Sequence, residues 1–394
     1  MKNNYIIAVN FPYSYLFNDI LLEYKDSIGV NHGLYVGRDP LYWIYLPSFV
    51  HYRRYLAINT SVNISSHKTN RSMNVDTSDW VRNELSELYN SLVVNSANLK
   101  VLIYNDGRSE SKGAISFCSD YDVDYFVFER GLFRNKSLTM DRKELGYDSA
   151  FRANYQKLRS KASLDSLEYR QENPLVRILY FVYFIYTSLF RKYDYYFSHK
   201  SFRSLIKIFL KKRKKKYLEN LENSYLVVMQ LEYDTSIVNK SEFASMQFYI
   251  REVEKSFYMS GSTDKSLIFC LHPLDVSSYD FDKRSKAKHG VASDELVTAY
   301  GVVTINSTVT IDALRLNLNL FSFGKGVYSN LGLCYEPPLH ELSLYFQDYY
   351  KEDFTNERAK WLSMLVGNYQ YQGDIFAYNK SDVRNLLKTI YYEN

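Results

Sequence analysis

The stretch that decides the fold reads SLIFCLHP at 266–273 and GVVTINSTV at 301–309. Each part is a short apolar run, typical of a buried strand, and each run ends in polar residues. These are His272 after the first run, and Asn306, Ser307 and Thr308 after the second. Ligands of open α/β sheets bind beyond the carboxyl ends of the strands. A helix N-terminus with hydroxyl groups nearby also suits a phosphate. We therefore expect the phosphate half of a nucleotide site here, although a strand-end histidine is as often structural.

Apolar strands alternate with helical patterns along most of the chain. The strand patterns are at 5–9, 101–104, 125–128, 225–229, 266–271, 301–305 and 318–323, and the main helical patterns are at 15–24, 77–94, 242–259, 361–366 and 381–391. This alternation predicts an α/β fold with parallel sheets. A length of 394 residues suits two domains.

The middle of the chain differs from its flanks. Residues 175–190 are almost wholly apolar and aromatic, but the run is shorter than the roughly 20 residues that cross a bilayer. A basic stretch follows, which includes Lys211, Lys212, Arg213, Lys214, Lys215 and Lys216. An apolar-aromatic segment beside a polybasic one suits a peripheral membrane anchor. A buried helix beside a solvated basic helix fits equally well. Nucleic acid is not expected as a partner, because no nucleic-acid-binding motif accompanies the lysines.

The cysteines and the N-terminus bear on the compartment. The three cysteines are odd in number and widely spaced, which indicates neither a disulfide framework nor a zinc site and favours a reducing compartment. The apolar run at 5–9 is too short for a signal peptide. The sequence therefore predicts a cytoplasmic protein.

Common nucleotide-binding motifs are missing. The sequence contains neither G-x-x-x-x-G-K-[ST] nor G-x-G-x-x-G, so P-loop hydrolysis and ordinary dinucleotide binding lose their usual support. Asp122 and Asp124 form a D-x-D pattern, which can hold a nucleotide diphosphate through a metal ion. Here the pattern precedes a strand, so a polar turn is favoured and no metal site is expected.

Acidic residues follow apolar strands in both halves of the chain. Glu129 does so in the first half and Asp234 in the second. Such residues are often mere caps, but two carboxylates facing each other across a domain cleft would suit glycosyl chemistry. Asp106 and Arg108 form a third strand-end group, in which the arginine could pair with a substrate carboxylate.

Several segments, in the same order along the chain, resemble motifs of the bacterial capsule-polysaccharide β-Kdo transferases. The stretch GVVTINSTV resembles that family's signature. The other segments are FERGLFR at 128–134, similar to F-E-E-G-Y-x-R; QLEYDTSI at 230–237, similar to Q-x-x-x-D-x-x-I; LHPLD at 271–275, similar to K-x-H-P-x-D; NDGR at 105–108, at the place of D-x-R; and GKGVY at 324–328, at the place of G-x-A-x-Y.

This resemblance implies two Rossmann-like domains in a GT-B-like arrangement with a helical basic middle. The implied parts are an acceptor-side domain at 1–170, a membrane-association segment at 171–222, a nucleotide-sugar-binding domain at 223–370, and a C-terminal helix at 371–394 that could pack back on the first domain. It also implies CMP-β-Kdo as donor, retention of configuration and no metal cofactor. The implied partners are a lysophosphatidylglycerol-type lipid acceptor, the anionic surface of the inner membrane and other capsule synthesis or export proteins.

The resemblance also implies roles for individual residues. Asp234 would be the nucleophile or the stabiliser of an oxocarbenium-like transition state, and Glu129 the general acid/base. The donor would be held by His272, which the resemblance also places among the catalytic residues, and by Gln230, Asn306, Ser307 and Thr308. The substrate would be contacted by Asp106, Arg108, Arg134 and Tyr328.

Three positions depart from the family pattern. Thr310 stands where a glycine is usual, Arg130 replaces the second acid, and Cys270 stands where a lysine is usual. These departures bear on the donor more than on the fold. Two alternatives therefore stay open: a surface-polysaccharide glycosyltransferase that uses another nucleotide sugar, and a non-catalytic scaffold that binds lipid or glycan through the basic middle.

Overall fold

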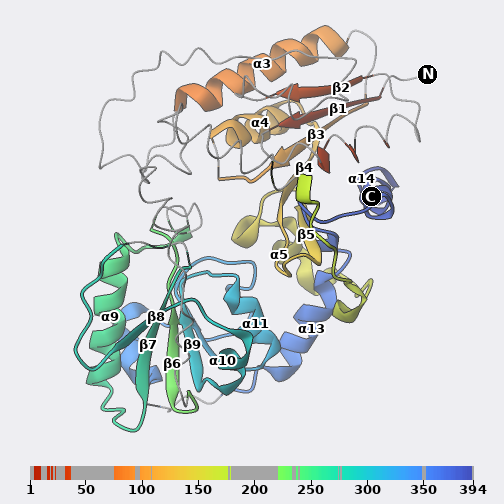
Figure 1. Cartoon of the computed structure of the whole chain (residues 1–394). Helices are drawn as coiled ribbons and strands as arrows, with labels where there is room; N and C mark the ends of the chain where they lie inside the picture. The colour runs from red at the N-terminus through yellow and green to blue at the C-terminus, as the bar shows by residue number, and fades with distance from the viewer. Residues whose placement is uncertain are drawn as a thin grey trace. The chain divides into compact units, whose positions relative to one another are not determined.

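The chain forms two compact units in the computed structural model (Figure 1). The first comprises Met1–Tyr193 together with Ser363–Asn394, and the second comprises Asp194–Leu362. The structure describes residues 4–9, 16–17, 19–20, 23, 32–36, 75–93, 98–107, 109–175, 178, 221–232, 237, 240–273, 275, 277–347 and 352–392. The C-terminal residues thus belong to the same unit as the N-terminal ones.

The first unit contains a six-stranded sheet in the order β11-β5-β4-β3-β1-β2. Its strands are β1 (Asn4–Val9), β2 (His32–Val36), β3 (Asn98–Tyr104), β4 (Asp124–Arg130), β5 (Ser137–Asp141) and β11 (Gln370–Gln372). Strands β1 to β4 run parallel, whereas β5 and β11 add antiparallel pairs at one edge. The last two strands were not predicted from the sequence.

Helices pack on both faces of this sheet. They are α3 (Val75–Val93), α4 (Ser109–Asp120) and α14 (Lys380–Tyr392), and a short helix α5 (Ala150–Asn154) follows β5. Alternate residues of a strand point to opposite faces. Val101 of β3 therefore lies in a core with Leu85 of α3 and Phe117 of α4. Leu102 lies in another core, to which α14 contributes Leu386.

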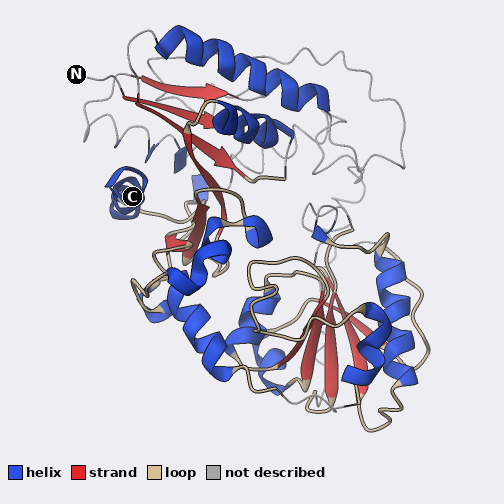
Figure 2. Cartoon of the chain, turned by 180° about the vertical axis from the view of Figure 1, so that it is seen from behind, coloured by secondary structure: helices blue, strands red, loops and turns tan. Residues whose placement is uncertain are grey.

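The second unit contains a five-stranded, wholly parallel sheet in the order β10-β9-β6-β7-β8 (Figure 2). Its strands are β6 (Ser224–Val228), β7 (Ser266–Leu271), β8 (Lys286–His289), β9 (Gly301–Thr304) and β10 (Asn319–Ser322). The chain adds β7 and β8 on one side of β6 and then β9 and β10 on the other. The predicted α/β class with two Rossmann-like units is confirmed.

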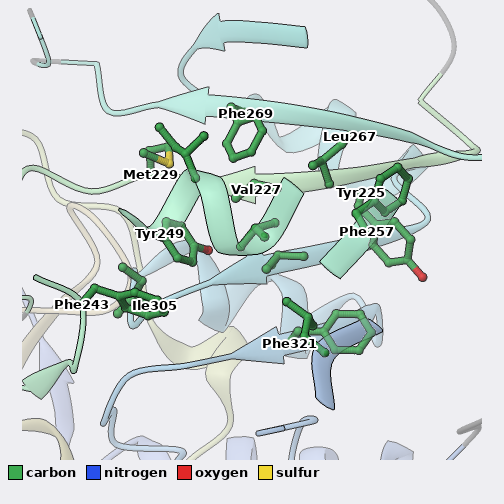
Figure 3. Close-up of a cluster of buried hydrophobic side chains, with 14 of the residues drawn as sticks. Tyr225, Val227, Met229, Phe243, Tyr249, Phe257, Leu267, Phe269, Ile305 and Phe321 are labelled. Carbon is green, nitrogen blue, oxygen red and sulfur yellow. The ribbon is translucent and has the colours of Figure 1, made fainter. Parts of the chain in front are cut away.

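The core of the second unit lies between the sheet and α9 (Met246–Met259). Figure 3 shows Tyr225, Val227 and Phe269 of the sheet together with Tyr249 of this helix. Further helices in the described part of the chain are α10 (Ser293–Thr298), α11 (Val309–Arg315), α12 (Leu342–Tyr345) and α13 (Thr355–Leu365). Helix α11 contacts β9 and β10.

Some predicted boundaries were wrong. The helix expected from residue 242 begins at Met246, because the Ser245 side chain caps it and accepts a hydrogen bond from the Phe248 N–H at 3.1 Å. Strand β8 and helix α10 lie between β7 and β9, where no strand or helix was predicted. Among helices in the described part of the chain, none has both the length and the apolarity to cross a bilayer.

Candidate functional site

Two amide residues join the carboxyl ends of the central strand β6 and its neighbour β9 in the second sheet. Gln230 follows β6 and Asn306 follows the adjacent strand β9. The Gln230 Nε2 group donates to Asn306 Oδ1 at 3.0 Å, and the Asn306 backbone N–H donates to Gln230 Oε1 at 3.1 Å. The strand order reverses at this point, and ligands of open α/β sheets bind where it does so. Gln230 is buried, so this pair is a fixed part of the edge.

A third predicted residue lies at the same edge. His272 follows β7, the neighbour of β6 on its other side, and is half-buried. Its backbone carbonyl accepts a hydrogen bond from the Asp275 N–H at 2.8 Å. The buried Asp275 carboxylate in turn accepts from the Ser277 N–H and the Tyr279 hydroxyl at 2.9 and 2.8 Å. The histidine therefore sits in a tight turn that Asp275 holds together.

The turn after β9 uses most of the N–H groups that were expected to face a phosphate. The Val309 N–H donates to Ser307 Oγ at 3.3 Å, and the Thr310 and Ile311 N–H groups donate to the backbone carbonyls of Ser307 and Thr308. Because these N–H groups donate within the turn itself, the structure does not support the expected phosphate contact through the N–H groups of a helix N-terminus, and the role of the side chains at this edge stays a prediction. The hydroxyl of Ser307 still has a proton to donate, and Thr308 is exposed.

Tyr328, predicted to contact substrate, is instead buried beneath this turn. Only 2% of it is exposed, and burial raises the pKa of its hydroxyl well above the usual value. The hydroxyl lies 3.2 Å from Ser322 Oγ and donates to Thr310 Oγ1 at 3.3 Å. The Ser322 hydroxyl donates to the Ile305 carbonyl at 2.9 Å. The prediction is corrected: Tyr328 supports the turn from below.

Glycine is required beside this turn. A Cβ atom on Gly324 would lie 2.7 Å from Ile305 Cγ2 and 3.1 Å from Asn306 Nδ2. Any larger residue would therefore push against the backbone and side chain that carry the amide pair.

A buried ion pair lies on the neighbouring strand. Lys288 of β8 is the cross-strand partner of Cys270, and its Nζ pairs with Glu295 of α10. Both charged side chains are almost wholly buried, so each depends on the other for compensation. A lysine is thus present beside the position where the resembled family has one. Burial raises the pKa of the Cys270 thiol to about 12, which makes it a poor nucleophile.

In the first unit, the predicted acid Glu129 lies near the end of β4 and is half-buried. Its Oε1 atom accepts a hydrogen bond from Asn105 Nδ2 at 3.3 Å. Asn105 follows β3, the parallel neighbour of β4. Asp106, next in the chain, accepts from the Leu145 N–H at 2.7 Å, so its carboxylate ties the turn to the segment after β5.

Arg130, which stands at the position of the family's second acid, has a structural partner. Its Nε and Nη2 groups each lie 3.2 Å from a carboxylate oxygen of Asp374, which is buried. Its guanidinium also lies 5.1 Å from the centre of the Phe376 ring. The arginine therefore anchors the C-terminal segment to β4.

The other predicted residues are spread more widely. Arg134 is exposed after β4, and Asp122 and Asp124 lie at the opposite end of that strand. Asp122 has a positive φ of 51°, and Asp124 pairs with Lys100 at 2.7 Å, so the D-x-D pattern forms a polar turn as expected. Outside the described residues lie Arg108, Asp234 and the basic run of Lys211, Lys212, Arg213, Lys214, Lys215 and Lys216.

Sequence reasoning missed Asn105 as a site residue. The available signal was an asparagine directly after an apolar strand and before Asp106-Gly107, a pattern typical of a left-handed turn.

In the part of the chain that the structure describes, no group of three or more His, Cys, Asp or Glu side chains is placed to hold a metal ion.

Comparisons with known proteins bear on the family. The family model described as "Capsule polysaccharide biosynthesis protein" matches residues 100–353. The chain is 26% identical over 276 residues to the capsule polysaccharide export protein KpsS of Escherichia coli, covering 61% of this chain and 71% of that protein. It is 22% identical to the capsule polysaccharide modification protein LipB of Neisseria meningitidis, with 71% and 76% covered.

Among solved structures, the chain is similar to KpsC of Thermosulfurimonas dismutans, a β-Kdo 2,7 transferase. The identity is 13%, the match covers 98% of this chain and 99% of that one, and the TM-score is 0.44. The family match spans both units and well over half of the residues, and it includes the strand ends that carry Asn105, Glu129, Gln230, His272 and Asn306. The chain therefore belongs to the family of capsule polysaccharide biosynthesis proteins.

Proposed function

We propose that this protein is a retaining glycosyltransferase that moves β-Kdo from CMP-β-Kdo to a lipid acceptor of the lysophosphatidylglycerol type. The observation that carries the proposal is the edge of the second sheet. Polar residues follow three neighbouring parallel strands there: Asn306 after β9, Gln230 after β6 and His272 after β7. This edge lies at a topological switch point in a member of a capsule polysaccharide biosynthesis family.

The second unit would hold the donor. The Gln230–Asn306 pair fixes the edge, and the imidazole of His272 and the hydroxyl groups of Ser307 and Thr308 supply donors for the single phosphate of CMP or the Kdo carboxylate. A donor with one phosphate carries less charge than a nucleoside diphosphate sugar. Neutral donors and an imidazole can offset that charge, and we propose that no metal cofactor takes part.

The two acids would share the chemistry. The carboxylate of Asp234 attacks the anomeric carbon or stabilises its positive charge while the bond to CMP breaks. The acceptor hydroxyl then attacks the same carbon, and its proton passes to Glu129. Two inversions, or one shielded face, leave the β configuration unchanged. Asp106, Arg108 and Arg134 would contact the acceptor or the Kdo carboxylate.

The acceptor and the site of action follow from the same proposal. A lipid acceptor would require the protein to work in the cytoplasm at the inner membrane. The apolar-aromatic run at 175–190 and the basic run at 211–216 supply the composition for peripheral binding to an anionic surface. Other capsule synthesis or export proteins are the expected partners.

A transfer assay tests this function. The protein is incubated with CMP-β-Kdo and lysophosphatidylglycerol, with and without EDTA, and the lipid is analysed by mass spectrometry. We expect a mass increase of one or more Kdo units, release of CMP, and no loss of product with EDTA. Asp234→Ala should abolish transfer while the melting temperature stays close to that of the wild type. Absence of both product and CMP release from the wild type contradicts the proposal.

A nucleotide panel separates this function from its alternatives. CMP should raise the melting temperature more than UDP or GDP does, because only CMP matches the proposed donor. A larger shift with UDP or GDP would indicate another sugar donor. No shift with any nucleotide, together with binding to anionic liposomes, would indicate the non-catalytic scaffold.

A further inference from the structure

Asn105 joins the ends of two neighbouring strands in the first unit. Its backbone N–H donates to the Phe128 carbonyl at 2.8 Å, so it continues the pairing of β3 with β4 by one residue. Its side chain then divides its two polar atoms. Oδ1 accepts from the Gly107 N–H at 2.8 Å, and Nδ2 donates to Glu129 Oε1 at 3.3 Å. The residue is 96% buried in this position, being only 4% exposed.

Three separate requirements meet at this residue. The backbone is left-handed, with φ at 59°, which favours glycine, asparagine or aspartate. The turn needs a side-chain acceptor for the Gly107 N–H, which asparagine and aspartate offer. Only asparagine also supplies the N–H donor that Glu129 accepts. The turn alone would be served by aspartate, so the asparagine amide points to a function at Glu129.

We propose that Asn105 is the positioning residue for Glu129, aiming its carboxylate and favouring its ionised form through the amide N–H. This inference rests on the proposed role of Glu129 as the general acid/base. A hydrogen bond donated to a carboxylate stabilises the charged form of the acid and fixes the direction of its lone pairs. The residue acts through Glu129 and is not itself a reacting group.

The charged groups around Glu129 make such a donor important. Asp106 in the same turn accepts from Leu145, and Asp141 of β5 accepts the N–H groups of Ala150 and Phe151. Burial raises the pKa of the Tyr369 hydroxyl well above its usual value, and the nearby negative charges of Asp141, Glu129 and Asp106 raise it further.

The arginine that follows Glu129 in the chain is paired with a different acid. Arg130, the neighbour of Glu129 on β4, is directed to Asp374. Among the described charged groups named here, those near Glu129 are acids, and a neutral donor favours its ionised state without adding a charge.

Two substitutions isolate this hydrogen bond. Asn105→Asp tolerates the left-handed backbone and keeps the acceptor for Gly107, but it replaces the N–H donor by a second carboxylate. Asn105→Gly keeps the backbone and removes the whole side chain. Asn317→Asp is the matched control, since Asn317 is also left-handed, accepts from Arg358 through Oδ1 and donates from Nδ2 to Thr355, in the other unit.

The first readout needs no transfer activity. The Glu129 carboxyl carbon is followed by ¹³C NMR through a pH titration of the full chain labelled with ¹³C-glutamate, and its signal is assigned with Glu129→Gln. We expect the Glu129 midpoint to rise by about one pH unit or more in Asn105→Asp, because two adjacent carboxylates cannot both ionise freely. It should rise less in Asn105→Gly and stay unchanged in Asn317→Asp. An unchanged midpoint in both Asn105 variants overturns the proposal.

The second readout is the pH profile of kcat/KM for Kdo transfer. The limb that Glu129 governs should move to higher pH by the same amount as its NMR midpoint, while the control keeps the wild-type profile. A midpoint that moves without the limb shows a merely structural contact and overturns the positioning role. Should the wild-type chain transfer no Kdo, the proposed function fails, and the NMR titration still decides whether Asn105 governs the ionisation of Glu129.

Discussion

The carboxyl edges of the two sheets are each joined by a buried amide, but the partner of that amide differs. In the second unit, Gln230 bonds to the side chain and backbone of Asn306, and both partners are neutral. In the first unit, Asn105 bonds to the carboxylate of Glu129. A neutral pair holds its geometry at any ordinary pH, which suits the binding of a nucleotide. A pair that contains a carboxylate changes with protonation, which suits proton transfer.

Backbone geometry reinforces this difference. Asn105 is held in a left-handed conformation by its own turn, so the amide is fixed before it meets Glu129. Asn306 belongs to a turn supported from below by the hydroxyl groups of Ser322, Thr310 and Tyr328. We infer that the amide of the first unit favours the ionised form of Glu129, whereas the amide pair of the second unit holds the geometry of its strand ends.

The largest expected effect comes from removing the charge of the first edge. Glu129→Gln keeps the size of the side chain and an oxygen that can accept from Asn105. We expect Kdo transfer to fall by about 10²–10⁴-fold, the usual contribution of a general acid/base. The CMP-induced rise in melting temperature should persist. Transfer at the wild-type rate would remove Glu129 from the chemistry and leave the first edge as a structural contact.

A smaller effect is expected when the second edge is given a charge. Gln230→Glu replaces the Nε2 donor by an oxygen that faces Asn306 Oδ1. An unsatisfied buried group costs about 1–3 kcal/mol, so CMP binding should weaken by roughly ten- to a hundredfold in calorimetry. Gln372→Glu is the control, because Gln372 makes a similar reciprocal pair with the backbone of Glu168 in the first unit. Equal CMP affinity in wild type and Gln230→Glu would separate the amide pair from donor binding.

The smallest effect is expected for the support beneath that edge. Tyr328→Phe removes one buried hydroxyl and should lower the free energy of unfolding by about 0.5–1.5 kcal/mol, measured by urea denaturation. CMP affinity should change little, because the ring lies below the turn and does not reach its surface. A large loss of CMP affinity at unchanged stability would restore Tyr328 as a ligand-contacting residue.

Local pattern predicted most of the apolar strands, including the edge strand β10, but it missed β5, β8 and β11. Strand β7 has five buried residues in sequence and was predicted as a strand. Strand β8 reads Lys-Ala-Lys-His, and only Lys288 of the four is buried, because an edge strand has one neighbour and covers little apolar surface. Strands β5 and β11 pair across more than 200 residues of sequence, and no short-range signal reports such a pairing.

The sequence by itself determined the α/β class, the polar residues that follow the central strands, and the family to which the chain belongs. Apolar periodicity and strand-end chemistry are local properties, so they can be read without coordinates. Only the tertiary structure decided which of those residues meet. It paired Gln230 with Asn306 and Asn105 with Glu129, directed Arg130 to Asp374, and buried Tyr328. Each of these outcomes depends on the distance between elements far apart in the chain, which sheet order and packing set together.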